Sequence, residues 1–307
     1  MGAPYSRQRR LFRPCCPRQS QGYKKGDCTL HALSRLKPEV LHHEVGKAQH
    51  EIDFRYDEAL RTADNIISFK HVVKAVAELH SYYATFMPKP PLYGLPGNGM
   101  HLHISLWKDG ENIFVGENGL SDTALYFIGG ILKHAKALTA LTNPTVNSYK
   151  RLVPGYEAPV YISWGYRNRS ALIRVPAFKG SGARIEYRCP DPSANPYLAF
   201  AGILMAGLDG IKRKIEPDSY VETNVYEMDE VERERLGIET LPGSLGEALE
   251  ELKKDKTVRE ALGRACRNFI DYKEREWEEY LEYLSLRDIP IDTKKVTEWE
   301  LERYFYV

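Results

Sequence analysis

The sequence predicts an α+β fold in which antiparallel strands are flanked by helices. Two short stretches, His101–Trp107 and Arg184–Arg188, alternate polar and apolar residues, which is typical of strands buried on one face. A strand with one polar face is typical of an antiparallel sheet. Three longer stretches, 58–86, 121–141 and 197–215, carry apolar residues at helical spacing.

The first alternating stretch predicts either a polar site or a solvated outer face. Gly97 and Gly99 precede it and supply a turn without Cβ atoms, where a ligand or another backbone can approach closely. The apolar residues of the strand then face a core. The polar residues share the other face: His101, His103 and Ser105.

The second alternating stretch favours the polar site. Arg184, Glu186 and Arg188 share one face, which is costly to dehydrate unless it meets further anions and cations. Phosphates, carboxylates and metal ions are the natural partners of such a face. Three more arginines precede this strand, and either they are solvated or they surround a polyanion such as triphosphate: Arg167, Arg169 and Arg174.

Composition indicates a soluble, cytoplasmic protein. The 307 residues are 43% hydrophobic, and 43 basic against 42 acidic residues give a net charge of +1. This balance gives no reason to expect nucleic acid or an anionic membrane as a partner. The longest apolar run, Tyr197–Leu208, is too short to span a bilayer. The five cysteines lack the spacing of a disulfide framework or a metal site.

Residues 1–36 form an irregular segment, whereas residues 37–307 form the predicted domain. The segment is rich in Arg, Gln, Pro and Cys and shows neither helical nor strand periodicity. It lacks the apolar core of a secretory signal. We expect disorder or a stretch outside the original reading frame, with a basic nucleic-acid-binding tail as the alternative.

The domain begins with a predicted hairpin over 39–54, followed by the helix over 58–86. Glu44 and Glu51 lie an odd number of residues apart, so one straight strand would send them to opposite faces. A hairpin lets both carboxylates converge beside a histidine, which suits a hard divalent cation. The proline-rich segment 88–96 then leads into the Gly97 turn.

The remaining elements follow from turn and cap signals. Lys108–Gly110 predicts a hairpin turn, and Ser121 is the expected N-cap of the helix ending near Leu141. Residues 143–159 hold three prolines and one glycine, which predicts a loop, with a mobile lid as one candidate role. The helix over 197–215 is apolar on nearly all sides and is therefore expected to be buried. Residues 244–283 predict surface helices that begin with a Ser244–Glu247 capping box.

Long motifs in the same order resemble the catalytic domain of type I glutamine synthetase, the bacterial and archaeal class. They cover the chain from about Pro38 to Val307. The motifs are HHEVGKAQHEIDFRYDEALRTADN from 42, NGMHLHISLW from 98, NPTVNSYKRLVPGYEAP from 143, NRSALIRVP from 168 and RIEYRCPDPSANPYLAFAGILMAGLDGIK from 184.

The resemblance implies a role for each matching residue. It implies Mg²⁺ or Mn²⁺ ligands (Glu44, Glu51, His101, Glu186), ATP contacts (Glu39, His103, Ser105, Arg169, Arg174, Arg184), glutamate contacts (Gly97, Arg151, Glu157, Arg188) and catalytic residues (Glu157, Arg169). The implied reaction is ATP-dependent ligation of ammonia to L-glutamate through γ-glutamyl phosphate. Glu157, on a flap that closes over glutamate, would attract ammonium and take its proton.

The sequence departs from the family pattern in two places. Pro96 stands where members usually carry an asparagine that contacts glutamate. Nothing in 1–34 resembles the β-grasp domain and first catalytic strand that members carry upstream. Because members form double-ring dodecamers whose sites lie between subunits, the chain alone is expected to hold an incomplete, inactive site. Tyr226 stands where some members are adenylylated.

Two alternatives to a glutamine synthetase remain. One is a γ-glutamyl ligase that uses a polyamine or another amine, although the Tyr156–Glu157 flap and the Asn168–Ser170 segment resemble the ammonia-using members more closely. The other is a non-catalytic fragment or pseudoenzyme that assembles with full-length subunits.

Overall fold

A computed structural model describes residues 38–91, 96–117, 119–154, 158–291 and 294–306. These residues form two compact units. The hairpin unit comprises residues 38–86 and Tyr306, and the sheet unit comprises Met87–Phe305. Among the described residues, no helix is both long and apolar enough to cross a membrane.

The hairpin unit contains the predicted hairpin and helix. Strands β1 (Pro38–His43) and β2 (His50–Phe54) pair antiparallel, with His42 opposite Glu51. Helix α3 (Ala59–Leu79) follows. Aromatic rings join these elements, since Phe69 stacks edge-on against a residue of β2, with ring centroids 5.3 Å apart. The predicted hairpin is confirmed, and the predicted helix is present but ends at Leu79 and not near Phe86.

The sheet unit is built around a four-stranded sheet with the order β3-β10-β9-β8. The alternating sequences predicted β3 and β10, and these two strands pair antiparallel, as do β10 and β9. The β8–β9 pair, in contrast, is parallel. The four strands are β3 (Leu102–Ile104), β10 (Ile185–Tyr187), β9 (Ile173–Val175) and β8 (Trp164–Tyr166).

Two short hairpins follow β3. The first joins β4 (Trp107–Lys108) to β5 (Glu111–Asn112), and positive φ angles of 52° at Asp109 and 83° at Gly110 close its turn. This is the predicted turn, and its backbone matches the twist of the flanking strands. The second joins β6 (Val115–Gly116) to β7 (Gly119–Leu120).

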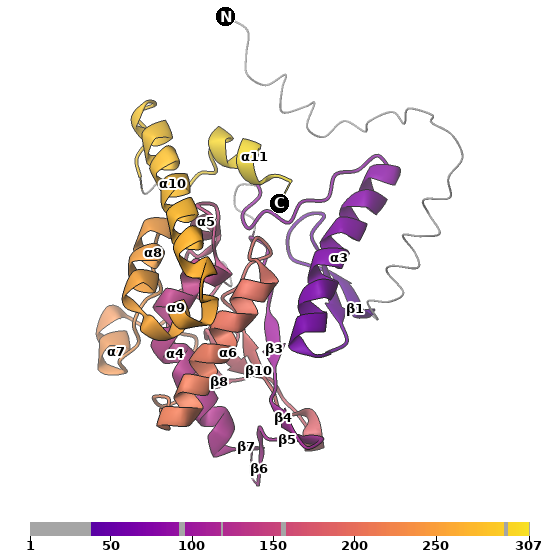
Figure 1. The fold of residues 1–307 in the computed structure, drawn as a ribbon, viewed down its shortest axis with the longest axis vertical. Coiled ribbons are helices and arrows are strands. Elements are labelled where there is room, and N and C mark those ends of the chain that lie inside the picture. Colours follow the sequence, from indigo (N-terminus) through magenta and orange to yellow (C-terminus); the bar gives the residue numbers. More distant parts are fainter. Residues whose placement is uncertain (1–37, 92–95, 118, 155–157, 292–293, 307) are drawn as a thin grey trace, which may run out of the picture. The chain divides into compact units, whose positions relative to one another are not determined.

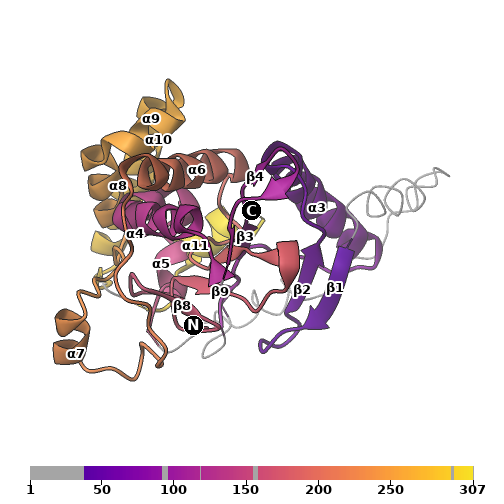
Figure 2. The ribbon, with the colours of Figure 1, turned by 90° about the horizontal axis from the view of Figure 1, so that it is seen from below.

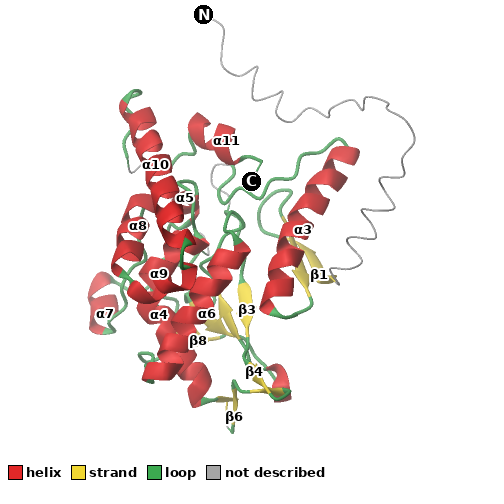
Figure 3. Cartoon of the chain, viewed as in Figure 1, coloured by secondary structure: helices red, strands yellow, loops and turns green. Residues whose placement is uncertain are grey.

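The helices of the sheet unit gather on one side of the sheet (Figure 1), as the perpendicular view also shows (Figure 2). A colouring by secondary structure separates the strands from these helices (Figure 3). They are α4 (Asp122–Thr142), α5 (Ser148–Arg151), α6 (Pro196–Arg213), α7 (Glu230–Arg235), α8 (Leu245–Lys254), α9 (Lys256–Leu262), α10 (Ala265–Ser285) and α11 (Glu298–Tyr304), with a 3₁₀ turn at Gly180–Gly182.

Helices α4 and α6 cross at glycines. Ser121 caps α4 as predicted, accepting a hydrogen bond from the backbone of Ala124 at 3.2 Å. A Cβ atom at Gly130 would lie 2.2 Å from the carbonyl oxygen of Ala206, and one at Gly210 would lie 2.1 Å from that of Tyr126. Only glycine therefore allows the two backbones to approach this closely.

Two predictions about helices are wrong. One face of α6 is exposed rather than buried, since Tyr197, Leu204, Met205 and Leu208 are 39% to 43% exposed. The stretch 143–159 is not wholly a loop, because α5 forms within it and its four residues are buried. Residues 143–152 therefore belong to the core.

The C-terminal helices have distinct N-terminal caps. Ser244 caps α8 as predicted, but the Glu247 carboxylate accepts its backbone hydrogen bond from Gly243, one residue earlier, at 2.8 Å. A full capping box occurs at α11, where Thr297 and Glu300 bond each other's backbone amides. The capping box at α11 was not among the sequence predictions.

A buried histidine joins three helical segments. His134 of α4 is 6% exposed, and its Nδ1 lies 2.6 Å from Asp255, the N-cap of α9. Its Nε2 lies 3.2 Å from Asp209 of α6, which also accepts a hydrogen bond from Arg213. Burial lowers the pKa of His134, but the bonds to the two carboxylates raise it more, so that the net shift is upward.

The fold should therefore lose stability as this imidazolium is titrated. Its contribution is fully present below pH 6.5, the pKa of an unfolded histidine, and is lost as pH rises through the raised pKa. His134→Gln should lower the free energy of unfolding at acidic pH by about 2 kcal/mol. Urea unfolding at a series of pH values measures this effect.

The control variant is Lys136→Gln, which removes an exposed ion pair with Glu239 from the same helix. An exposed ion pair contributes little to the free energy of unfolding, so this variant should show the same dependence of stability on pH as the wild type. Equal pH profiles for His134→Gln and the wild type would contradict the assignment.

Candidate active site

Glu186 lies at the centre of the predicted polar site. It is on β10, directly opposite His103 of β3 on one side and Arg174 of β9 on the other. Residues that face each other across strands point to the same side of a sheet. The sheet register therefore brings together three side chains that are far apart in sequence.

Glu186 is 3% exposed, and its carboxylate is surrounded by two arginines and a histidine. Arg174 Nε contacts its Oε2, while His101 Nδ1 and Arg188 Nε lie 3.3 Å and 3.8 Å from its Oε1. Burial alone would raise its pKa, but the hydrogen bonds from His101 and Arg174 more than offset burial and lower the pKa to about 2. Glu186 is therefore an anion at every physiological pH.

Both histidines of the β3 stretch are held neutral. Burial lowers the pKa of His101, and the charge of Arg188 adds to this, against the opposing effect of Glu186. Burial and Arg184 lower the pKa of His103 in the same way, and Arg184 Nε donates to its Nδ1 at 3.2 Å. A neutral imidazole can coordinate a metal ion through an unprotonated nitrogen.

The Gly97 turn packs against Arg151. A Cβ atom at Gly97 would lie 2.9 Å from Cγ of Arg151, and one at Gly99 would lie 2.9 Å from its Nη2 and 3.0 Å from Nε2 of His101. Glycine is therefore required at both positions. The predicted glutamate contacts Gly97 and Arg151 do lie together, and Gly99 borders both Arg151 and the predicted metal ligand His101.

Arg151 is 4% exposed and is oriented by backbone carbonyls. Its Nη1 donates to Cys189 at 2.7 Å and its Nη2 to Arg188 at 3.2 Å. Burial lowers its pKa, although a guanidinium remains charged under any working condition. Arg151 thus brings a buried positive charge to the end of β10, where a carboxylate ligand would offset it.

Arg169 lies between two buried residues that fix its backbone. The Asn168 amide donates to the carbonyls of Val221 and Thr223 at 2.8 Å and 2.9 Å, and Ser170 Oγ accepts from Val225 at 2.9 Å. Arg169 itself is exposed, and its carbonyl accepts a hydrogen bond from Arg188. A long cationic side chain on a fixed backbone suits recognition of a phosphate.

The other predicted ATP contacts lie on both units. Ser105 follows β3 in the sheet unit and accepts a hydrogen bond from Trp107 Nε1 at 3.0 Å. Arg184, just before β10, is half-buried. Glu39 is an exposed residue of β1 in the hairpin unit. Glu39 therefore belongs to a different unit from Ser105 and Arg184.

The carboxylates predicted to converge on the hairpin do so. His42 Nδ1 lies 3.4 Å from Glu44 and its Nε2 lies 3.7 Å from Glu51. Ligand atoms of His42, Glu51 and Asp53 all lie within 4.8 Å of one another, so one cation could contact all three. One nitrogen and several carboxylate oxygens fit a divalent ion such as Mg²⁺ or Mn²⁺. We call His42, Glu44, Glu51 and Asp53 the hairpin cluster.

Crowding of carboxylates gives the hairpin cluster an unusual pKa. Burial, a hydrogen bond to Glu44 and the charge of Asp53 together raise the pKa of Glu51 to about 8. A proton or a cation is therefore needed to hold these carboxylates together. The cluster contains a histidine, as predicted, and departs from the prediction only in containing Asp53. Asp53 could have been found from sequence, because it lies on the same strand face as Glu51.

Glu157 lies outside the described residues, and the structure does not test its predicted role. The next residue, Ala158, is buried, and its carbonyl accepts a hydrogen bond from the Tyr226 hydroxyl at 2.6 Å.

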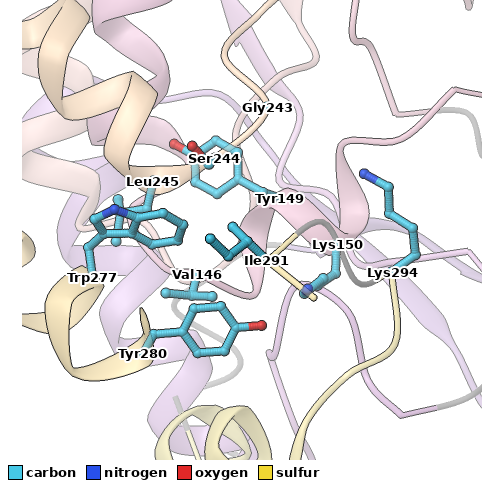
Figure 4. A pocket seen from close by; sticks show the side chains of 10 residues that line it. All are labelled: Val146, Tyr149, Lys150, Gly243, Ser244, Leu245, Trp277, Tyr280, Ile291 and Lys294. Carbon is cyan, nitrogen blue, oxygen red and sulfur yellow. The ribbon is translucent and has the colours of Figure 1, made fainter. Parts of the chain in front are cut away.

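A small cavity of about 40 Å³ lies beside the α5 segment (Figure 4). The residues around it come from that segment, the start of α8, α10 and the chain before α11. The hydroxyl of Tyr149 is buried there without a hydrogen-bond partner among the described residues. Of the predicted site residues none lines this cavity, although Lys150 precedes Arg151.

Cys189 follows Arg188 and is completely buried. Its Sγ donates to Asn143 Oδ1 at 2.9 Å, and its carbonyl accepts from the side-chain amide of Asn143 at 3.0 Å. Burial raises the pKa of this thiol to about 11. Asn143 caps the C-terminus of α4, so these bonds tie the helix to the end of β10.

Comparison with known proteins agrees with this arrangement. A family model described as "Glutamine synthetase, catalytic domain" matches residues 27–304. The chain belongs to the glutamine synthetase family. It is 92% identical over 272 residues to a glutamine synthetase of Thermococcus kodakarensis, a match that covers 89% of this chain and 61% of the relative. A glutamine synthetase of Pyrococcus abyssi is 81% identical over 272 residues, covering 89% of this chain and 62% of the relative.

Solved structures of the glutamine synthetase type share the fold. One titled "Apo GmaS without ligand" is 40% identical with a TM-score of 0.74, covering 90% of this chain and 61% of that one. One titled "GmaS/ADP complex-Conformation 1" is 38% identical with a TM-score of 0.75, covering 94% of this chain and 67% of that one. The chain thus spans about three-fifths of the length of the curated relatives it matches.

Removing the Glu186 charge should destabilise the sheet unit. Glu186→Gln leaves Arg174 and Arg188 without their buried anion, and we expect the free energy of unfolding at neutral pH to fall by about 3 kcal/mol. The stabilisation in the wild type is present above pH 4.5 and is lost as pH falls toward about 2, because the folded-state pKa is depressed. Urea unfolding between those pH values measures both effects.

The matched control is Glu250→Gln, which removes an exposed carboxylate paired with Lys253. It should leave stability nearly unchanged. A Glu186→Gln protein as stable as this control would contradict the central role of Glu186.

Cation binding at the hairpin cluster should depend on pH. Because a metal ion must displace the Glu51 proton, Mn²⁺ affinity should rise between pH 4.5 and about 8 and then level off. The rise should approach about tenfold per pH unit, as release of one proton requires. Titration calorimetry with Mn²⁺ measures it.

Glu51→Gln should weaken this binding and remove the part of its pH dependence that comes from the Glu51 proton, so that affinity no longer rises up to about pH 8. His43→Gln serves as the control, since His43 neighbours the cluster but does not belong to it. A pH-independent Mn²⁺ affinity in the wild type would argue against a cation site in the hairpin cluster.

Proposed function

We propose that this chain provides catalytic-domain residues of an enzyme that ligates ammonia to L-glutamate at the expense of ATP, giving L-glutamine. The observation that carries the proposal is the buried Glu186 carboxylate, held by His101, Arg174 and Arg188 at the meeting of β3, β9 and β10. Membership of the glutamine synthetase family supports it. The intermediate would be γ-glutamyl phosphate, because a carboxylate must be activated before an amine can displace its oxygen.

Divalent cations would be held at two places. His101 with Glu186 would hold one ion, and the hairpin cluster, through Glu44 and Glu51, would hold another. Mg²⁺ or Mn²⁺ there would offset negative charge as phosphate meets carboxylate. The neutral His101 imidazole and the permanently ionised Glu186 are the protonation states that metal ligation requires.

The arginines would bind the two anionic substrates. Arg169, Arg174 and Arg184, together with His103, Ser105 and Glu39, would contact ATP. Buried Arg151 and Arg188 would bind the carboxylates of glutamate beside Gly97, whose missing side chain lets the turn pack closely against Arg151. The rigid backbone of the adjoining segments would hold these charges before substrate arrives, which lowers the cost of reorganisation during reaction.

Glu157 would complete the reaction as a general base. A carboxylate next to bound glutamate would attract ammonium and take one proton, leaving ammonia as the nucleophile. Arg169 would offset charge on the transferred phosphoryl group.

We further propose that the protein acts as a homo-oligomer in the cytoplasm. A γ-glutamyl ligase acting on a polyamine or another amine is the second candidate, since an activated γ-carboxylate can be attacked by any amine.

The test places the 272 matched residues of this chain into the Thermococcus kodakarensis relative, to which they are 92% identical. This chimera should form glutamine only with glutamate, ATP and ammonium together. Its Glu157→Ala variant should lose amide formation far more than acyl-phosphate formation, by about a hundredfold or more in kcat, because only the second step needs the base.

Three outcomes discriminate among the candidates. Glutamine formation by the parent relative but not by the chimera would refute the proposal. Faster product formation with methylamine or a polyamine than with ammonium would favour the amine ligase. Equal loss of both steps in Glu157→Ala would make Glu157 a substrate ligand instead of a base.

A further inference from the structure

Asn147 connects two backbone segments of the sheet unit. It is completely buried, and its Oδ1 accepts a hydrogen bond from the Lys89 amide at 2.7 Å. Its Nδ2 donates both to the Lys89 carbonyl at 3.1 Å and to Glu300 Oε1 at 2.9 Å. One side chain thus pairs with both polar backbone atoms of Lys89, as a neighbouring strand would.

Glu300 holds the Asn147 amide in the orientation that this pairing needs. Its carboxylate is also completely buried, and Oε2 accepts hydrogen bonds from the Thr297 amide at 2.8 Å and hydroxyl at 2.9 Å. Only the amino group of Asn147 can donate to the remaining oxygen, which fixes which end of the amide faces Lys89. The α11 capping box therefore determines the orientation of a side chain that lies 153 residues away in sequence.

The segment that Asn147 holds is the support of the Gly97 turn. The Asn98 amide donates to the Pro88 carbonyl at 2.7 Å, and the Asn98 side chain donates to the Met87 carbonyl at 2.8 Å. The same Pro88 carbonyl would lie 2.5 Å from a Cβ atom at Gly97. Movement of the backbone next to Lys89 would therefore move the turn directly.

Asn147 is also linked to Arg151 through a single turn of helix. It precedes α5, whose last residue is Arg151, and Lys150 N donates to its carbonyl at 3.0 Å. A Cβ atom at Gly97 would lie 2.5 Å from the Pro88 carbonyl oxygen and 2.9 Å from Arg151 Cγ, so Gly97 is confined between these two groups. Asn147 bonds to the backbone next to Pro88, and it directly precedes the helix that carries Arg151.

We propose that Asn147, oriented by Glu300, is a positioning residue that sets the spacing between the Gly97 turn and Arg151. The substrate meaning of this spacing rests on the proposed function, in which Gly97 and Arg151 contact glutamate. Neither Asn147 nor Glu300 reaches the substrate. Both act by fixing the distance between two groups that do, and loss of either loosens the Gly97 turn and weakens glutamate binding more than ATP binding.

The experiment compares Asn147→Ala and Glu300→Gln with the wild-type chain. Hydrogen exchange of the Asn98 amide should accelerate about tenfold in both, since a net hydrogen bond that held its acceptor segment is lost. Exchange in β10 (Ile185–Tyr187) should stay unchanged. Calorimetric titration should show glutamate affinity falling about tenfold while ATP affinity changes less than about twofold.

Thr297→Ala is the matched control. It removes the other half of the α11 capping box but keeps the bond between Glu300 and Asn147, so it should lower the melting temperature while leaving Asn98 exchange and glutamate affinity unchanged. If Asn147→Ala does not fold, Glu300→Gln decides, because Gln keeps the size of the side chain.

The outcomes separate this inference from the proposed function. Wild-type exchange at Asn98 in both variants, or equal acceleration in Thr297→Ala, would overturn the positioning role. If the wild-type chain does not bind glutamate at all, the exchange measurement decides whether Asn147 holds the turn, and the glutamate affinities are then compared in the chimera with the Thermococcus kodakarensis relative. If that chimera does not bind glutamate either, the proposed glutamate site fails. Accelerated exchange at Asn98 together with equal losses of glutamate and ATP affinity would also overturn the positioning role of Asn147. The effect of the substitution would then not be confined to the Gly97 turn.

Discussion

The burial of one carboxylate constrains the whole sheet unit. An ionised Glu186 can lie inside the protein only if positive charges and hydrogen-bond donors meet it. These come from Arg174 on β9, from Arg188 at the end of β10 and from the neutral His101 before β3. The strand register is fixed as a result, because a slip by one residue would send Glu186 to the apolar face and Ile185 or Tyr187 to the polar one. Arg174 and Arg188 in turn depend on Glu186, because its carboxylate offsets their positive charges.

The helices hold the ends of this charged network. Asn143 at the end of α4 bonds Cys189 and Asp191, just after β10, and the α4–α6 crossing places both helices without intervening side chains. Buried α5 carries Arg151 directly to the end of β10. The cationic groups are therefore attached to packed secondary structure and not to flexible loops. Such attachment is what electrostatic preorganisation requires of a site that handles phosphate and carboxylate groups together.

Much of this could be predicted from sequence, and the exceptions have physical causes. Alternation alone identified the polar faces around His103 and Glu186, because side chains alternate across a strand wherever it lies. Helix α5 was missed because it is only four residues long and because its surroundings include distant partners, such as Glu300 beside Asn147, which no local pattern reports. The exposure of Leu208 on α6 was missed because composition does not say which faces of a helix have neighbours. The parallel β8–β9 pair was unexpected because such pairs normally need a long crossover, whereas here a short segment with a positive φ of 55° at Arg167 joins them. The individual ligand roles still rest on resemblance.

Cys189 gives the site an internal chemical reporter. Its thiol lies next to Arg188 in the chain, yet burial and a pKa of about 11 leave almost no thiolate to react with oxidants or alkylating agents. Its reactivity therefore depends on the exposure of the β10 end, not on the intrinsic chemistry of the sulfur. The rate at which a thiol reagent labels Cys189 would count the openings of the arginine-bearing core, even with no substrate present.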